Sequence, residues 1–233
     1  MTMPSLAPLL NALFPPRCAA CGEFVPPSHP LCGDCEGAWP SLSEPGCSVC
    51  ALPFAAGPSH VCGDCLERAP AFECLHASGV YEGLLLDLVV RLKYRGEERL
   101  AAFLGERMAA SVVGKTPDLI LPVPLHVARL RERGFNQAVL LARRIGKRLG
   151  VATDARLLRK TRPTPPQATL KIDERRKNLK GAFRLKDPSQ VSGRSVLLVD
   201  DVATTGATLH EAARVLKQAG AARVEALVAA RAL

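Results

Sequence analysis

Apolar positions recur at regular spacing from about residue 75 to the C-terminus. Leucines at helical spacing predict a helix over 84–93, and a similar period predicts helices over 100–113 and 209–219. Asn136 can cap a further helix, which has one apolar face and one basic face and ends at Gly150. Continuous apolar runs predict buried strands at 118–124, 194–200 and 223–230, and shorter strands are expected at 78–81 and 156–160. Strands that alternate with helices indicate an α/β fold with a doubly wound parallel sheet, whose ligand lies beyond the carboxyl ends of the strands.

The segment before Pro70 has a different pattern, with many cysteines and prolines and few large apolar side chains. Eight of the nine cysteines form four C-x-x-C pairs there, and the second half repeats the first at an offset of 29 or 30 residues. We therefore expect two unequal domains, a small one over residues 1–70 and a larger one over 71–233.

The cysteine spacing is typical of structural zinc sites, because each C-x-x-C knuckle turns two sulfurs toward one point and two knuckles complete a tetrahedron. In a sequential arrangement Cys18, Cys21, Cys32 and Cys35 bind one Zn²⁺ and Cys47, Cys50, Cys62 and Cys65 bind the other. An interleaved cross-brace is the alternative, and the repeat favours the sequential pairing. Four thiolates leave no open position, so two structural Zn²⁺ sites are expected, and folding of this segment should depend on metal.

Three other side chains that could bind a metal ion belong to neither of the two predicted zinc sites. His29 and His60 precede the second knuckle of each repeat and are expected at the surface, because four thiolates already complete each site. Cys74 lacks a paired cysteine and is expected to be a buried, inert thiol.

The net charge is +9 with a pI near 9.3, and much of the excess lies in the second half of the chain. This balance favours anionic partners such as phosphorylated small molecules or nucleic acid. Since no apolar run approaches the roughly 20 residues that a membrane span requires, membrane insertion is not expected. The N-terminal stretch lacks the features of a secretory signal, which makes the cytoplasm the expected location.

The clearest candidate for a ligand site follows the apolar run 194–200. Asp200 and Asp201 occur where that strand is expected to end, and such a pair can accept hydrogen bonds from two neighbouring sugar hydroxyls. The next residues are small or hydroxyl-bearing, include Gly206 and open a helix, which is the composition of a phosphate-binding loop. The acid pair and the loop together fit a ribose 5-phosphate.

The 13 residues from Val196 to Thr208 match, at every position, the phosphoribosyl pyrophosphate (PRPP) signature of type I phosphoribosyltransferases. Over nearly its full length the chain resembles the ComF family of competence-associated proteins. The other matching motifs, besides the cysteine pairs, are Lys93-Tyr-Arg-Gly96, Pro122-Val-Pro-Leu-His126, Arg131-Glu-Arg-Gly-Phe-Asn-Gln137, Thr164-Pro-Pro-Gln167 and Arg175-Arg-Lys-Asn178. The resemblance implies a type I phosphoribosyltransferase-like sheet preceded by a small double zinc-ribbon domain.

The resemblance also implies roles for the residues of the site. Asp200 and Asp201 would be the catalytic acids that hold the ribose hydroxyls. The 5-phosphate would bind to a loop made of Val202, Ala203, Thr204, Thr205, Gly206, Ala207 and Thr208. The pyrophosphate and its Mg²⁺ would contact Pro122, Val123 and Pro124, with Arg131 and Arg133 as guanidinium clamps. The basic segment Thr161 to Lys180 would be a lid that closes over PRPP and excludes water.

The reaction implied is attack of a nitrogen nucleophile on C1 of PRPP with departure of Mg²⁺-pyrophosphate, but the sequence contains no recognisable pocket for the acceptor. A second interpretation is a competence factor that binds single-stranded DNA and uses PRPP as a regulatory ligand, with Trp39, Tyr94 and Phe135 as candidates for base stacking. A third is a zinc scaffold that recruits other competence proteins.

Overall fold

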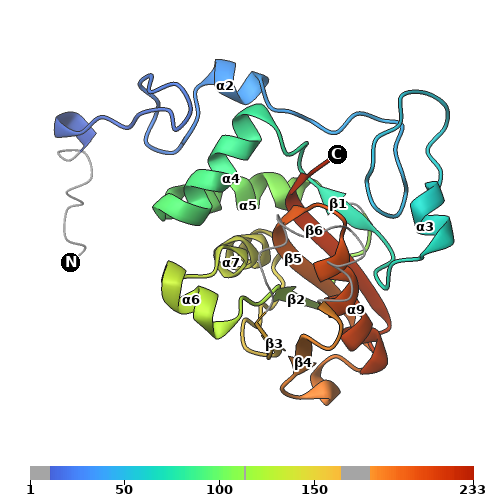
Figure 1. The fold of residues 1–233 in the computed structure, drawn as a ribbon. Helices are drawn as coiled ribbons and strands as arrows, with labels where there is room; N and C mark the ends of the chain where they lie inside the picture. The colour runs from blue at the N-terminus through green and yellow to red at the C-terminus, as the bar shows by residue number, and fades with distance from the viewer. Residues whose placement is uncertain (1–10, 113, 164–178) are drawn as a thin grey trace.

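The computed structural model describes residues 11–112, 114–163 and 179–233 (Figure 1). Two small cysteine-rich units come first in the chain, and a sheet covered by helices follows them. Within the described ranges, no helix is both long enough and apolar enough to cross a membrane.

A four-stranded parallel sheet lies at the centre of the larger part, with the strand order β1-β6-β5-β2. Its strands are β1 (Leu75–Ala77), β6 (Arg223–Arg231), β5 (Ser195–Ala203) and β2 (Leu119–Pro122). The two central strands, β5 and β6, are almost entirely buried because their Val- and Leu-rich sequences are covered on both faces. The doubly wound parallel sheet expected from the sequence is confirmed.

Helices cover both faces of the sheet, and alternate residues of β5 point to different helices. Leu197 and Val199 belong to a core shared with α4 (Gly83–Arg95), α5 (Glu98–Ala110) and α7 (Gln137–Leu149). Val196 and Leu198 belong to a second core with α9 (Ala207–Gln218). The same alternation places successive polar residues of β5 on opposite faces.

An antiparallel pair of short strands, β3 (Leu158–Lys160) and β4 (Phe183–Leu185), packs against the second core next to α9. A short helix, α6 (Val127–Arg133), follows β2, and a 3-10 helix, η2 (Pro188–Gln190), precedes β5. The sequence predicted neither β4 nor α6, since β4 has three residues and α6 buries none.

Among the predicted bounds that differ from the structure, two differ because of contacts between distant segments. Of the strand expected at 78–81, Val80 alone forms a β-bridge, to Arg231, and the regular strand lies at Leu75–Ala77 because the chain bends at Ser78 and Gly79. The Trp39 indole donates to the Ser78 carbonyl at 2.6 Å, and a Cβ on Gly79 would lie 2.5 Å from the Pro40 carbonyl oxygen. The strand expected to end at Asp200 continues to Ala203 through pairing with β6.

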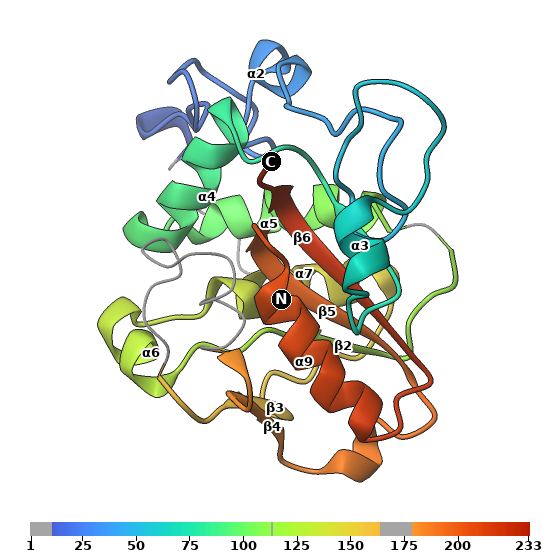
Figure 2. The same ribbon diagram turned by 45° about the vertical axis from the view of Figure 1, so that its right-hand side comes forward.

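The two cysteine-rich units contact different parts of the larger fold. The first includes α2 (Gly33–Gly37), which lies near α4 and α5 in both views, and Glu36 pairs with Arg107 at 2.9 Å (Figures 1 and 2). The second includes α3 (Gly63–Glu67) and approaches the sheet, where the Leu75 N–H donates to the Val49 carbonyl at 2.8 Å. The division at residue 70 stays a prediction.

Candidate functional site

The candidate ligand edge is the carboxyl end of β5 and β2. Because β5 runs on to Ala203, Asp200 and Asp201 are consecutive strand residues whose side chains leave opposite faces of the sheet. Asp201 lies on the side of α4, and Asp200 lies on the side of β3. Each carboxylate therefore has a different cationic neighbour.

Asp201 is buried and forms an ion pair with Lys93 of α4, with Oδ1 3.0 Å from Nζ. Burial alone would lower the pKa of Lys93, but the negative charges of Asp201 and Asp200 outweigh it and raise the pKa. The other carboxylate oxygen of Asp201, Oδ2, is also buried and has no hydrogen-bond partner among the described residues. An unpaired buried oxygen of this kind needs a partner that the described side chains do not supply, such as a water molecule, an ion or a ligand hydroxyl.

Asp200 is half-buried and accepts a hydrogen bond from the Asp201 N–H at 2.9 Å. Burial and the adjacent Asp201 carboxylate raise the pKa of Asp200 to about 7, against the opposing charges of Lys93 and Lys160. Lys160, at the end of β3, has its pKa lowered by burial, and the charge of Asp200 offsets this in part. The two acids thus differ in environment.

The loop from Val202 to Thr208 connects β5 to α9. Gly206 is the N-cap of α9 with a φ of 70°, a left-handed conformation that favours glycine. The Ala207 N–H donates to Thr205 Oγ1 at 3.4 Å, and the Thr204 side chain is exposed. The free N–H groups and positive dipole of a helix N-terminus are suited to an anion, so the loop has the geometry expected of a phosphate cradle.

The loop after β2 lies next to this edge. The Val123 N–H donates to the Val199 carbonyl at 2.8 Å, and the Asn136 side chain donates to the Val123 carbonyl at 3.0 Å. These bonds hold Pro122, Val123 and Pro124 beside β5. The His126 side chain accepts from Ala128 and caps α6.

A cavity of about 430 Å³, lined by the end of α4 and by α6, contains one of the two predicted clamps. Arg133 lies in it, donates to Gln137 Oε1 at 2.6 Å and stacks over Tyr94 at 5.2 Å. Arg131 is exposed on α6 and is not among the described residues that line the cavity, whereas Arg129 is. Arg133 and Arg129 therefore both line this cavity.

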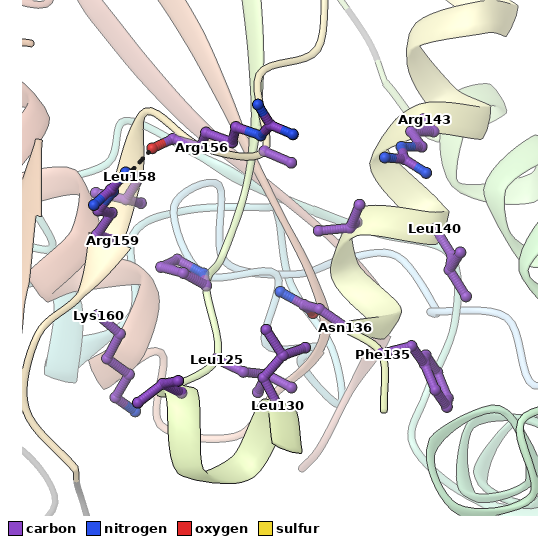
Figure 3. A pocket seen from close by; sticks show the side chains of 14 residues that line it. Leu125, Leu130, Phe135, Asn136, Leu140, Arg143, Arg156, Leu158, Arg159 and Lys160 are labelled. Atoms are coloured by element: carbon purple, nitrogen blue, oxygen red, sulfur yellow. Dashed lines mark hydrogen bonds between the residues drawn. The ribbon is translucent and has the colours of Figure 1, made fainter. Parts of the chain in front are cut away.

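A larger cleft of about 570 Å³ is lined by Pro124 and Leu125 of the loop and by residues of α6, α7 and β3 (Figure 3). Figure 3 shows Arg159 and Lys160 on one side, Arg143 of α7 on the opposite side, and Leu125 and Leu130 between them. None of the described residues that line the cleft is acidic. A cleft with apolar walls and several cations is suited to an anion that also carries an apolar ring.

The cysteines form two clusters, each with its four sulfurs within 4.8 Å of one another. The first consists of Cys18, Cys21, Cys32 and Cys35, and the second of Cys47, Cys50, Cys62 and Cys65. The sulfurs of Cys21 and Cys32 are 3.6 Å apart and those of Cys50 and Cys62 are 3.7 Å apart, as expected along the edges of a zinc tetrahedron. The structure therefore brings the sequential sets together.

Backbone amides support one thiolate in each cluster. Burial opposes ionisation of Cys47, but the N–H groups of Cys50 and Cys62, 3.5 and 3.3 Å from its sulfur, help to lower its pKa to about 6. Cys18 is supported in the same way, and its pKa is also about 6. Zinc binds the deprotonated thiol, so the donor set fits structural Zn²⁺.

The aromatic residues proposed for base stacking differ in exposure. Trp39 is buried, donates to Ser78 and packs edge-on against Phe103 at 5.7 Å, so the expectation that it could stack on bases was wrong. Tyr94 is 72% exposed, and Phe135 lines both cavities beside the β2 loop.

Several residues that shape the site were not singled out from the sequence. Lys93 belongs to a motif that was recognised without a role, and Lys160 ends a predicted strand. Arg231, at the end of β6, donates to carbonyls of the phosphate loop. Most of the predicted lid, residues 164–178, lies outside the described residues, together with the motifs Thr164 to Gln167 and Arg175 to Asn178.

Two family models match the chain: the double zinc ribbon domain over residues 9–66 and the phosphoribosyl transferase domain over residues 100–233. The chain is 39% identical over 186 residues to the DNA utilization protein YhgH of Salmonella typhimurium, covering 77% of this chain and 81% of that protein. It is 31% identical over 225 residues to competence protein F of Haemophilus influenzae, covering 93% and 97%.

A structural likeness to the purine phosphoribosyltransferase from Pyrococcus horikoshii is weak. The TM-score is 0.31 at 20% identity, over 54% of this chain and 66% of that one, and it adds no weight. The chain belongs to the phosphoribosyltransferase domain family, in the ComF group whose members carry a double zinc ribbon before that domain.

Proposed function

We propose that the chain binds PRPP with Mg²⁺ at the carboxyl end of β5 and β2 and acts as a phosphoribosyltransferase. In this proposal Asp200 and Asp201 hold the ribose hydroxyls, and the loop from Val202 to Thr208 binds the 5-phosphate. The observation that carries it is the arrangement of two acids, with one buried carboxylate oxygen unpaired among the described residues, directly before a glycine-capped helix N-terminus.

The pyrophosphate and its Mg²⁺ would lie on the other side of the ribose, toward Pro122, Val123 and Pro124. Arg133 and Arg129 supply cationic side chains near that loop, and Arg131 would have to turn inward to contribute. Guanidinium groups match the oxygens of a phosphate in pairs, which supports this orientation of the substrate.

In the proposed reaction a nitrogen of the acceptor forms a bond to C1 as the bond from C1 to the pyrophosphate oxygen breaks. The pyrophosphate leaves with Mg²⁺, and the nitrogen then loses its proton to solvent. Arginines and lysines near the leaving group stabilise the charge that develops on it, so no nucleophilic side chain is needed. The acceptor is not identified by the residues of the site.

Calorimetric titration of PRPP in the presence of Mg²⁺ tests the binding proposal. Wild-type protein should bind PRPP, and Asp200→Ala and Asp201→Ala should each weaken binding by at least about tenfold, because each removes a charged hydrogen-bond acceptor. Asp187→Ala, at the N-cap of the exposed 3-10 helix η2 and at the opposite end of β5, is the matched control. Absence of binding at millimolar PRPP would contradict the proposal, and pyrophosphate release with a panel of nitrogen acceptors separates turnover from binding alone.

Binding of single-stranded DNA is a second candidate function, and the cleft of Figure 3 favours it. Arg143, Arg156, Arg159 and Lys160 line that cleft together with Phe135, so phosphates and an unstacked base could be bound side by side. The names of the relatives, a DNA utilization protein and competence protein F, support a link to DNA uptake and to other competence proteins as partners.

Fluorescence anisotropy with a labelled single strand, measured over a salt series, tests the DNA candidate. Replacing Arg156 or Arg159 with Gln should weaken DNA binding. The slope of the logarithm of the binding constant against the logarithm of the salt concentration should also become shallower, by about one for each phosphate that the removed guanidinium had neutralised. Arg194→Gln, exposed just before β5 at the other end of the sheet, should change neither. Equal binding by all variants would exclude the cleft as the DNA site.

The proposal also includes two structural Zn²⁺ ions and a cytoplasmic location. Eight thiols held in two clusters are suited to a reducing compartment, in which they stay available to metal.

A further inference from the structure

Among the described residues, a third group of metal-binding side chains lies at the opposite end of the sheet from the proposed PRPP site. Cys74 Sγ is 3.3 Å from His76 Nε2 and 3.3 Å from Glu225 Oε1. His76 Nε2 is in turn 3.5 Å from Glu225 Oε2. The three side chains thus form a closed triangle of a sulfur, a ring nitrogen and a carboxylate.

Strand register explains why they meet. Leu75 pairs with Ala226 in the parallel ladder between β1 and β6, so Cys74 lies beside Glu225. Residues two apart on a strand share a face, which places His76 on the same side as Cys74, while Leu75 points into the core on the other face. The triangle is therefore built by the backbone and does not depend on a flexible surface side chain.

We infer that Cys74, His76 and Glu225 bind a divalent cation of borderline softness, of which Zn²⁺ is the best fit. Zinc bonds of about 2.3 Å to sulfur and about 2.0–2.2 Å to nitrogen and oxygen give tetrahedral edges of roughly 3.3–3.8 Å. The Sγ–Nε2 distance of 3.3 Å and the Nε2–Oε2 distance of 3.5 Å lie within that range, and the ligand atoms of all three residues lie within 4.8 Å of one another. These distances also resemble the sulfur separations of 3.6 and 3.7 Å in the two cysteine clusters.

The charges around the triangle are compatible with a cation. On binding Zn²⁺ the Cys74 thiol would release its proton to solvent, and the thiolate and the Glu225 carboxylate together would balance the charge of the ion. Arg223 forms an ion pair with Glu225 Oε1, which leaves Oε2 toward His76 and would orient the carboxylate from behind.

The position indicates a structural role. Glu225 precedes the end of β6 by six residues, or roughly 20 Å of strand, so the cation would be remote from the carboxyl edge. It would add a link between β6 and the short edge strand β1, which pairs with β6 at three ladder positions. Three protein ligands leave a fourth position for water.

Counting zinc in the purified full-length chain by mass spectrometry, after dialysis against buffered free Zn²⁺, tests the inference. Wild-type protein should hold three ions per chain, whereas Cys74→Ser, His76→Gln and Glu225→Gln should each hold two. His29→Gln, an exposed histidine beside the first cysteine cluster, should still hold three. Two ions in the wild type, or three in all of the triangle variants, would overturn the site and leave a hydrogen-bonded cluster without metal.

A second measurement covers the case in which Cys74→Ser fails to fold. His76→Gln keeps the size and polarity of a half-buried side chain, and its thermal midpoint should no longer rise when Zn²⁺ is added beyond two equivalents. A midpoint that responds to the third equivalent as in the wild type would equally overturn the inference. PRPP binding by the same variant reports on the proposed function separately.

Discussion

The side chain of Arg231 donates from Nε to the carbonyl oxygen of Cys50 at 2.9 Å. Its other end donates to the carbonyls of Ala203 at 3.3 Å and of Thr204. One buried guanidinium therefore connects the second cysteine cluster to the first residues of the proposed phosphate loop. Residues from both, with α9, line one cavity of about 760 Å³.

Arg231→Lys should lower both stability and PRPP affinity. A lysine ammonium cannot reach both the Cys50 and the Ala203 carbonyls, so at least one buried acceptor loses its partner, at a cost of about 1–3 kcal/mol. For a chain of this size that corresponds to a fall of roughly 2–12 °C in the thermal midpoint. Arg184→Lys, on the exposed face of β4, is the control, and identical midpoints for the two variants would contradict this role.

The raised pKa of Asp200 predicts a dependence on pH. The folded protein holds a proton on Asp200 up to about pH 7, whereas an unfolded chain releases it near pH 4. The resulting stabilisation is complete below pH 4 and is lost as the pH rises through about 7. Asp200→Asn, which cannot ionise, should therefore be more stable than the wild type by about 1–3 kcal/mol at pH 8 and nearly equal at pH 4.

The ionisation of Asp200 that lowers the stability of the fold should raise the affinity for PRPP. An ionised Asp200 accepts hydrogen bonds from ribose hydroxyls better than a protonated one, so PRPP affinity should fall as the pH drops below 7. Calorimetry between pH 5.5 and 8.5 measures this, with urea unfolding at the same values for stability. A flat stability difference between Asp200→Asn and the wild type would contradict the assignment.

Lys93 and Asp201 should behave as a coupled pair. Lys93→Met leaves a buried carboxylate without its cation and should cost about 3–5 kcal/mol, whereas the double variant Lys93→Met, Asp201→Asn removes both charges and should recover most of that loss. Urea unfolding of the two singles and the double gives the coupling energy. Additive losses would show that the two side chains do not interact in solution.

The elements that sequence predicted correctly are those with a long internal pattern. Helix α7 has Asn136 as its N-cap, with the side chain accepting from Ala138, and Gly150 at its end, as expected. Strands β5 and β6 each keep an apolar run long enough to be recognised. The cysteine clusters follow from a repeat in which each copy is complete.

The parts that sequence did not predict depend on contacts between distant segments. The bend that displaces β1 is fixed by Trp39 and Pro40, and no local pattern near Ser78 indicates it. The partners of Asp200 and Asp201 come from Lys160 and Lys93, which only the folded sheet brings to one edge. The triangle at Cys74 likewise needs the register of two strands far apart in the chain, which is why Cys74 was expected to be inert.

The two cysteine clusters should differ in their effect on PRPP binding, because only the second is joined to the phosphate loop through Arg231. Cys35→Ser and Cys65→Ser alter equivalent positions of the repeat, and each should remove one Zn²⁺ per chain and lower the thermal midpoint. Cys65→Ser should also weaken PRPP binding by about tenfold, since loss of the knuckle releases the Arg231 anchor, while Cys35→Ser should leave it within about twofold. Zinc counting and calorimetry on both variants measure the difference. Equal losses of affinity would mean that the clusters act only through overall stability, and the connection through Arg231 would then have no functional consequence.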